Sequence, residues 1–152
     1  MNEMLGNQYF MARNYMKAAT VFSDVLKEDP DNTNANKKLI ISLTQIGKYT
    51  QAVDQFFYFI HEHVDAIIET DPEKDDCPCP DLVKNLEHLT RHGSESFTTY
   101  ETLGILWLYC DLHKSIEYFQ KAAELKPSDE QVKSILAILY NKSAELSSQK
   151  HS

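Results

Sequence analysis

Apolar and small residues return along the chain with the 3.6-residue period of amphipathic helices. Between residues 100 and 127 two such segments follow one another, marked by Leu103, Gly104, Trp107, Ile116, Phe119 and Ala122. Only residues 110–113 separate them, so the two predicted helices must turn back antiparallel. Pro127 cannot continue a helix interior, and the second helix is therefore expected to stop near Lys126.

The same order of residues occurs twice more, earlier in the chain. The first copy reads Leu5, Gly6, Tyr9, Ala18, Phe22 and Pro30, and the second, 34 residues on, reads Leu39, Leu43, Ala52 and Phe56. In the second copy Ile40 replaces the small glycine, which predicts a wider spacing between its two helices. Val64 stands where the closing proline would be, so the apolar stripe continues to about Thr70, before Asp71-Pro72 ends it.

An insertion of different character separates the second and third copies. Residues 69–76 are acidic and broken by proline, which is typical of a solvated loop. The Cys-Pro-Cys-Pro run at residues 77–80 is expected to lie outside regular helix. Asp81 is a plausible N-cap for a short helix that runs to about His92. The apolar face of that helix would be formed by Leu82, Val83, Leu86 and Leu89.

A last amphipathic segment follows Pro127. Its apolar stripe consists of Val132, Ile135, Leu136, Leu139 and Tyr140. It is expected to cover the exposed end of the helical array as a capping helix over residues 129–145. Residues 146–152 form a polar tail that is expected to fray.

This spacing resembles the tetratricopeptide repeat (TPR), in which an aromatic, a Leu-Gly pair and an aromatic precede a small residue, an aromatic and a proline. The resemblance implies an all-α fold of antiparallel helical hairpins stacked in a right-handed superhelix, with the insertion between repeats two and three. The expected single domain comprises repeat one at 1–32, repeat two at 33–66, the insertion at 67–96 and repeat three at 97–128. The turn in repeat three is one residue shorter than the family's.

Composition limits the possible partners. The 152 residues carry a formal net charge of −8, which opposes a nucleic-acid or anionic-membrane surface. The longest apolar run, residues 103–110, is too short to span a bilayer, and the N-terminal residues do not resemble a signal peptide. Three cysteines do not form a disulfide framework. We therefore expect a cytoplasmic protein.

The family resemblance also implies a binding groove, lined by the first helices of successive repeats. The matching positions are Asn7, Phe10, Met11, Asn34, Lys38, Ile41, Gln45, Glu101, Ile105, Leu108 and Tyr109. A groove of this composition suits a protein or peptide segment with hydrophobic anchors. One family subset clamps a C-terminal carboxylate; only Asn7 and Lys38 match its residues, and Glu3 stands at its first lysine position. Alternatively, the apolar residues pack inside the array or beneath Leu82, Leu86 and Leu89.

Candidate chemistry outside the groove is sparse. No catalytic constellation has a defensible spacing, and no cofactor is implied. A zinc site could draw on Cys77, Cys79, His88 and His92, although the cysteine spacing is unusual. His61 and His63 lie on another helix, on different faces. We expect no metal and two free thiols in this segment, and a buried, unreactive Cys110.

Together these features favour a non-enzymatic adaptor or scaffold that binds a protein segment. Two alternatives remain open at this stage. A small, acidic chain with three such repeats is similar to class II chaperones of type III secretion, which lack this insertion. The insertion could instead make the protein a metal or thiol sensor.

Overall fold

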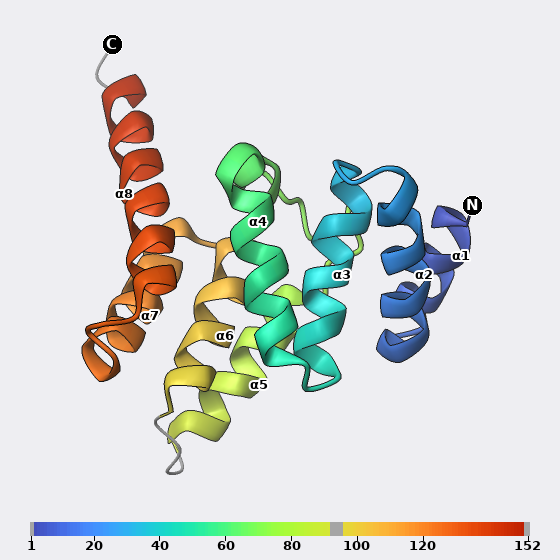
Figure 1. Cartoon of the computed structure of the whole chain (residues 1–152), viewed down its shortest axis with the longest axis horizontal. Coiled ribbons are helices and arrows are strands. Elements are labelled where there is room, and N and C mark those ends of the chain that lie inside the picture. The colour runs from blue at the N-terminus through green and yellow to red at the C-terminus, as the bar shows by residue number, and fades with distance from the viewer. Residues whose placement is uncertain (1, 92–95, 151–152) are drawn as a thin grey trace. The chain divides into compact units, whose positions relative to one another are not determined.

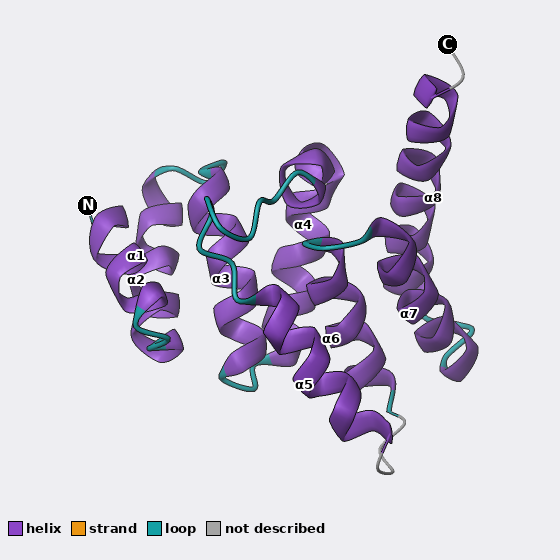
Figure 2. Ribbon diagram, turned by 180° about the vertical axis from the view of Figure 1, so that it is seen from behind, coloured by secondary structure: helices purple, strands orange, loops and turns teal. Residues whose placement is uncertain are grey.

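The computed structural model describes residues 2–91 and 96–150, and within these ranges the chain is all-α, with no strand (Figures 1 and 2). The helices in chain order are α1 (Glu3–Met11), α2 (Tyr15–Glu28), α3 (Thr33–Gln45), α4 (Tyr49–Ile68), α5 (Cys79–Arg91), α6 (Phe97–Leu108), α7 (Leu112–Leu125) and α8 (Glu130–Lys150). The all-α prediction is confirmed. None of these described helices combines the length and the apolar character that crossing a bilayer requires.

The chain divides into two compact units, Met1–Ile67 and Ile68–Ser152. The first holds α1 to α3 and all of α4 but its last residue, and the second holds α5 to α8.

In the first unit, α1 and α2 form a closely crossed hairpin because Gly6 has no side chain. A β-carbon on Gly6 would lie 2.7 Å from Cε1 of the Phe22 ring, a separation that real β-carbons essentially never show. Phe22 is fully buried, as the pattern predicts. Asn14 begins α2 as its N-cap, with its side chain accepting a hydrogen bond from the Lys17 amide. Helix α3 then packs against both α1 and α2.

The hairpin of α3 and α4 is joined by a partly buried polar contact. The Gln55 side chain of α4 donates a hydrogen bond of 2.6 Å to Oδ1 of Asn36 in α3. Asn36 is fully buried, and its amide donates to the carbonyl oxygens of Pro30 and Asn32. One side chain therefore joins the two helices to the loop that precedes α3.

Helix α4 runs to Ile68, close to the predicted end near Thr70, but it is not continuous. His63 has non-helical dihedral angles, φ −128° and ψ 31°. The interruption falls one residue before Val64, where the repeat pattern would place its closing proline. The second helix of this repeat thus breaks near the usual position, and a short helical extension follows. The sequence indicated the extension but not the break.

In the second unit, α5 begins earlier than expected. It starts at Cys79, so Asp81 lies in its first turn and is not the N-cap. The carbonyl oxygen of Pro78 accepts hydrogen bonds from the amides of Asp81 and Leu82. Proline is tolerated in a first helical turn because an amide there has no partner within the helix. The expectation that residues 77–80 all lie outside helix was therefore wrong for Cys79 and Pro80.

The α6–α7 hairpin repeats the close crossing of α1 and α2. A β-carbon on Gly104 would lie 2.6 Å from the Phe119 ring. The Ser115 hydroxyl donates a hydrogen bond of 2.6 Å to the Gly104 carbonyl oxygen, and both residues are buried. Each helix thus contributes a small residue to this crossing, Gly104 from α6 and Ser115 from α7, as the pattern predicts.

The three hairpin turns have equal length, at residues 12–14, 46–48 and 109–111. Arg13 and Gly47, which are 34 residues apart, both adopt positive φ, at 60° and 79°. Glycine suits this conformation because it has no β-carbon to clash with the backbone. Within the described chain, the third turn has no such residue. Repeat three has one residue fewer than the family pattern between its two helices. Helix α6 ends earlier and the turn adopts a different conformation, so the turn itself is not shortened.

The final helix, α8, packs on α7 and is longer than expected. It continues to Lys150, whereas the sequence indicated a frayed tail from residue 146. The predicted apolar stripe is largely confirmed: Val132, Ile135, Leu136 and Leu139 are buried, while Tyr140 is exposed. The Tyr140 hydroxyl accepts a hydrogen bond from Gln120 of α7, which gives the outer edge of this stripe a polar partner.

Candidate binding surfaces

On the first unit, polar side chains of α1 and α3 form a connected network. The Asn7 Oδ1 atom accepts hydrogen bonds from the Asn34 amide, at 2.9 Å, and from the Lys38 ammonium, at 3.1 Å. These three residues are half-buried, so each keeps some contact with solvent. Asn34 and Lys38 are one helical turn apart, so both donors lie on the same face of α3. On that face they meet Asn7 of α1.

Glu3 belongs to the same network. Its carboxylate accepts hydrogen bonds of 2.8 Å from the side-chain amides of both Asn32 and Asn34. The Glu3 carboxylate thus takes up amide donors of both asparagines and places a negative charge beside this network. Whether this face can clamp a carboxylate, which the sequence disfavours because of Glu3, stays a prediction.

The apolar groove positions behave differently from the prediction of an open strip. Five of the six predicted anchors are buried to 1% exposure or less, namely Phe10, Ile41, Ile105, Leu108 and Tyr109. Met11, by contrast, is 65% exposed. Of the polar positions, Gln45 is exposed and Glu101 is buried. The buried side chains offer no surface to a partner in this structure.

Phe10 illustrates why a groove position can be part of the core. Its ring meets Tyr15 edge-on at 5.8 Å between centroids. Lys38 and Arg13 place their charged groups 5.4 and 5.7 Å from the same ring, within cation–π range. These contacts hold the α1–α2 turn against α3, so Phe10 stabilises the fold.

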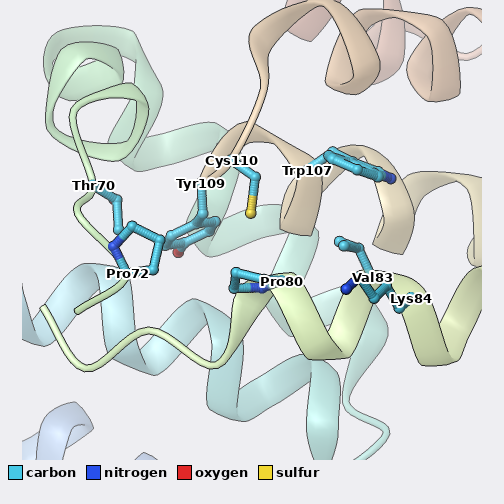
Figure 3. A pocket seen from close by; sticks show the side chains of 8 residues that line it. All are labelled: Thr70, Pro72, Pro80, Val83, Lys84, Trp107, Tyr109 and Cys110. Atoms are coloured by element: carbon cyan, nitrogen blue, oxygen red, sulfur yellow. The ribbon is translucent and has the colours of Figure 1, made fainter.

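In the second unit, a pocket of about 220 Å³ opens between α5, the preceding loop and the C-terminal end of α6 (Figure 3). It is lined by Thr70, Pro72, Pro80, Val83, Lys84, Trp107, Tyr109 and Cys110. The Tyr109 ring is buried in its wall, and this burial raises the pKa of the Tyr109 hydroxyl well above its ordinary value. The indole nitrogen of Trp107 is buried with no hydrogen-bond partner. The sequence did not indicate this pocket, because nothing in the Pro-rich segment predicts where it folds back.

Helix α5 is held to α7 as well as to α6. The Tyr118 hydroxyl of α7 donates a short hydrogen bond to the Glu87 carboxylate of α5. Burial is the main cause that raises the pKa of Tyr118 far beyond its usual range, followed by this hydrogen bond to Glu87. Of the predicted apolar face of α5, Val83 is buried, Leu82 and Leu86 are half-buried, and Leu89 is exposed.

The expectation of free thiols at Cys77 and Cys79 was wrong. Cys77 and Cys79 form a disulfide, so neither sulfur is available as a zinc ligand. His88 is exposed on α5, and His92 lies outside the described residues.

Cys110 is exposed, whereas we expected it to be buried. Its sulfur nevertheless faces the pocket in Figure 3. Partial burial of the thiol, and then the neighbouring Asp111 carboxylate, raise the pKa of Cys110.

Comparisons with known proteins give distant matches among solved structures. No protein-family model and no curated protein matches the sequence. A solved structure of MamA is 19% identical, with 91% of this chain aligned to 79% of that chain and a TM-score of 0.42. The first TPR of Spaghetti (RPAP3), solved with the HSP90 peptide SRMEEVD, is 15% identical over 93% of this chain and 90% of that chain, with a TM-score of 0.40. MamA from Desulfovibrio magneticus RS-1 is 16% identical, covering 97% and 86%, with a TM-score of 0.37.

The deciding features are the successive antiparallel hairpins and the two glycine–phenylalanine crossings at equivalent positions. By these features of the chain itself, the fold is of the tetratricopeptide type. On this TPR fold the second hairpin has Ile40 at the glycine position, fully buried and equivalent to Gly6. A likeness at this level of identity concerns helical arrangement alone, so a binding surface must be argued from this chain's own residues.

Proposed function

We propose that this chain is a non-enzymatic protein-interaction module that holds an extended peptide on the exposed face of α1 and α3. The observation that carries this proposal is the Asn7–Asn34–Lys38 network, which is half-buried and lies on two neighbouring first helices. Such groups suit a peptide backbone because a side-chain amide has both donor and acceptor atoms.

Met11 supplies an apolar contact for the same peptide. It follows Asn7 by one helical turn, so both side chains project from the same face of α1. At 65% exposure it is available to pack against a partner's side chain. Methionine is adaptable in such a role because its side chain is unbranched and polarisable. The proposal therefore keeps the predicted hydrophobic anchor but limits it to this one accessible residue.

Charge complements this picture. Glu3 borders the network, and the whole chain carries a net charge of −8. A partner with basic residues beside its apolar anchor would be steered towards this face, and the charges would mainly raise the association rate. Lys38 is already engaged by Asn7 and the Phe10 ring, so it is less suited to recognise an acidic partner.

The test is selection of binders from a random-peptide display library, followed by affinity measurement on variants. Met11→Ala and Asn7→Ala should each weaken binding by roughly 1–2 kcal/mol, which is roughly 5- to 30-fold in Kd. Met16→Ala is the matched control, because Met16 is 68% exposed but lies on α2. Peptides that bind Met11→Ala and Asn7→Ala as tightly as the unmodified protein would exclude this face.

A second candidate function rests on the Cys77–Cys79 disulfide, which favours thiol sensing over metal sensing in this segment. The bond lies where the loop after α4 enters α5, and the Cys77 amide donates to the carbonyl oxygen of Pro72. Reduction would release a constraint next to the pocket wall formed by Pro72 and Pro80. A melting temperature that is the same with and without a thiol reductant would count against this function.

A further inference from the structure

Three side chains with metal-binding atoms converge in the first unit. Asp31 comes from the loop between α2 and α3, and Glu62 and His63 come from α4. One ligand atom from each residue lies within 4.8 Å of the other two. We propose that these residues form a binding site for a divalent transition-metal ion of the zinc class.

The spacing of the ligand atoms suits one shared metal ion better than a direct hydrogen bond between His63 and Asp31. The His63 Nε2 atom lies 3.6 Å from Oδ1 of Asp31, which is too long for a hydrogen bond. Two ligands that bind zinc tetrahedrally at about 2.0–2.2 Å are separated by about 3.3–3.5 Å. The Glu62 carboxylate is exposed and can turn to close the remaining distance. Water would complete the coordination.

His63 presents its nitrogen to this site with nothing else to bind it. The Nε2 atom is buried and has no hydrogen-bond partner, although the side chain as a whole is 34% exposed. A buried polar atom without a partner is costly, and a metal ion would satisfy it. The ring lies 5.1 Å from the Phe59 ring between centroids, which restricts its orientation. Imidazole nitrogen with two carboxylate oxygens is a donor set that zinc accepts.

The break in α4 explains how two consecutive residues reach one site. Neighbouring positions in a regular helix point about 100° apart around the axis, because a turn holds 3.6 residues. At His63 the backbone leaves helical geometry, with φ −128° and ψ 31°. The helix interruption thus redirects His63 relative to Glu62. A sequence pattern cannot show this convergence, since on a continuous helix Glu62 and His63 would point in different directions.

Asp31 is held near α4 by the polar contact between Gln55 and Asn36 described above. The Pro30 carbonyl oxygen, directly before Asp31, accepts a hydrogen bond of 3.0 Å from Asn36, which in turn accepts from Gln55 of α4. Asn32, directly after Asp31, caps α3 by accepting from the Ala35 amide at 2.9 Å. Both neighbours of Asp31 are therefore anchored, and the site is partly organised before any ion binds.

The experiment uses the untagged full-length chain and zinc chloride, with binding followed by isothermal titration calorimetry. One equivalent of zinc should bind. Asp31→Asn and His63→Ala should each weaken binding by at least the roughly 10- to 100-fold that losing an outer-shell partner costs. The matched control is His61→Ala, because His61 is an exposed histidine of the same helix whose Nδ1 pairs with the Phe57 carbonyl oxygen. The zinc affinity of His61→Ala should equal that of the unmodified protein.

A second measurement shows whether a variant that loses zinc binding is still folded. Asp31 has an exposed side chain on a loop, so Asp31→Asn should fold normally, and circular dichroism checks this. Saturating zinc should raise the melting temperature of the unmodified protein and of His61→Ala, but not of Asp31→Asn. Absence of zinc binding would overturn the proposal. Binding that survives both Asp31→Asn and His63→Ala would also overturn it, and would indicate adventitious coordination elsewhere, at Cys110 or His88. The peptide-binding proposal does not depend on either result.

Discussion

Gly104 and Phe119 lie so close together that a β-carbon on Gly104 would stand 2.6 Å from two carbon atoms of the Phe119 ring. Gly6 and Phe22 repeat this relationship at 2.7 Å in the first hairpin. All four residues are buried, so neither ring can move aside into solvent. The glycine of the repeat pattern is therefore required by the space that an aromatic ring of the paired helix occupies.

The first prediction follows from this contact. Gly104→Ala should destabilise the protein by about 1–3 kcal/mol, because overpacking forces rings and backbone to shift. Chemical denaturation measures this change. In a Phe119→Leu background the same substitution should cost less, since the obstructing ring is gone, and a double-mutant cycle would report the difference. Equal costs in both backgrounds would show that Phe119 is not the obstacle.

The second prediction concerns the hairpin in which Ile40 takes the glycine position. Ile40 and Phe56 are both fully buried, so the second hairpin must accommodate a branched side chain where the others leave room for a ring. We expect the axes of α3 and α4 to lie farther apart than those of α1 and α2 or of α6 and α7. A crystal structure with three equal interaxial distances would refute this expectation.

Much of the helical framework could be predicted because it depends on local periodicity. Leu, aromatic and small residues at the repeat spacing located the three hairpins, and Phe22, Phe56 and Phe119 are all fully buried as expected. The break at His63, the start of α5 at Cys79 and the disulfide could not be predicted in this way. Each depends on contacts between the segment and the rest of the fold, which a periodic pattern does not describe.

The exposure of the predicted groove residues could not be predicted, for a related reason. A helical stripe of apolar residues looks the same whether it meets solvent, a partner or another helix. Leu108 and Tyr109 match groove positions of the repeat, yet both are buried, and helix α5 packs against α6. The polar positions Asn7 and Lys38 do form a hydrogen-bonded network, because partly buried polar groups need partners.

The third prediction compares two adjacent phenylalanines of α4. Phe56 is fully buried and Phe57 is half-buried, so removing the first ring should leave the larger cavity. Phe56→Ala should cost about 3–5 kcal/mol. Phe57→Ala is the matched control and should cost clearly less in the same urea titration. A reversed order would mean that the assignment of repeat two along the chain is displaced by one residue.

The fourth prediction concerns alkaline pH. Burial raises the pKa of Tyr109 well above its ordinary value of 10.0, so the folded protein keeps this proton after the unfolded chain has released it. The unfolded state then binds fewer protons, and stability falls as pH rises above about 10. Melting curves between pH 8 and pH 11 should show this fall, and it should be shallower in Tyr109→Phe. A fall of the same slope in both proteins would assign the effect to other groups.

The last prediction separates a binding residue from a core residue among the groove positions. Tyr109→Ala should destabilise the protein by about 3–5 kcal/mol, as expected when a fully buried aromatic side chain is removed. Met11→Ala should change the free energy of unfolding by no more than about 0.5 kcal/mol, because its side chain is already in solvent. Thermal and urea denaturation of both variants measure these values. If Met11→Ala melts as early as Tyr109→Ala, Met11 belongs to the core and the exposed face of α1 and α3 loses its apolar anchor. If Tyr109→Ala retains full stability, the Tyr109 side chain is not part of the core, and the predicted groove on α6 becomes available to a partner again.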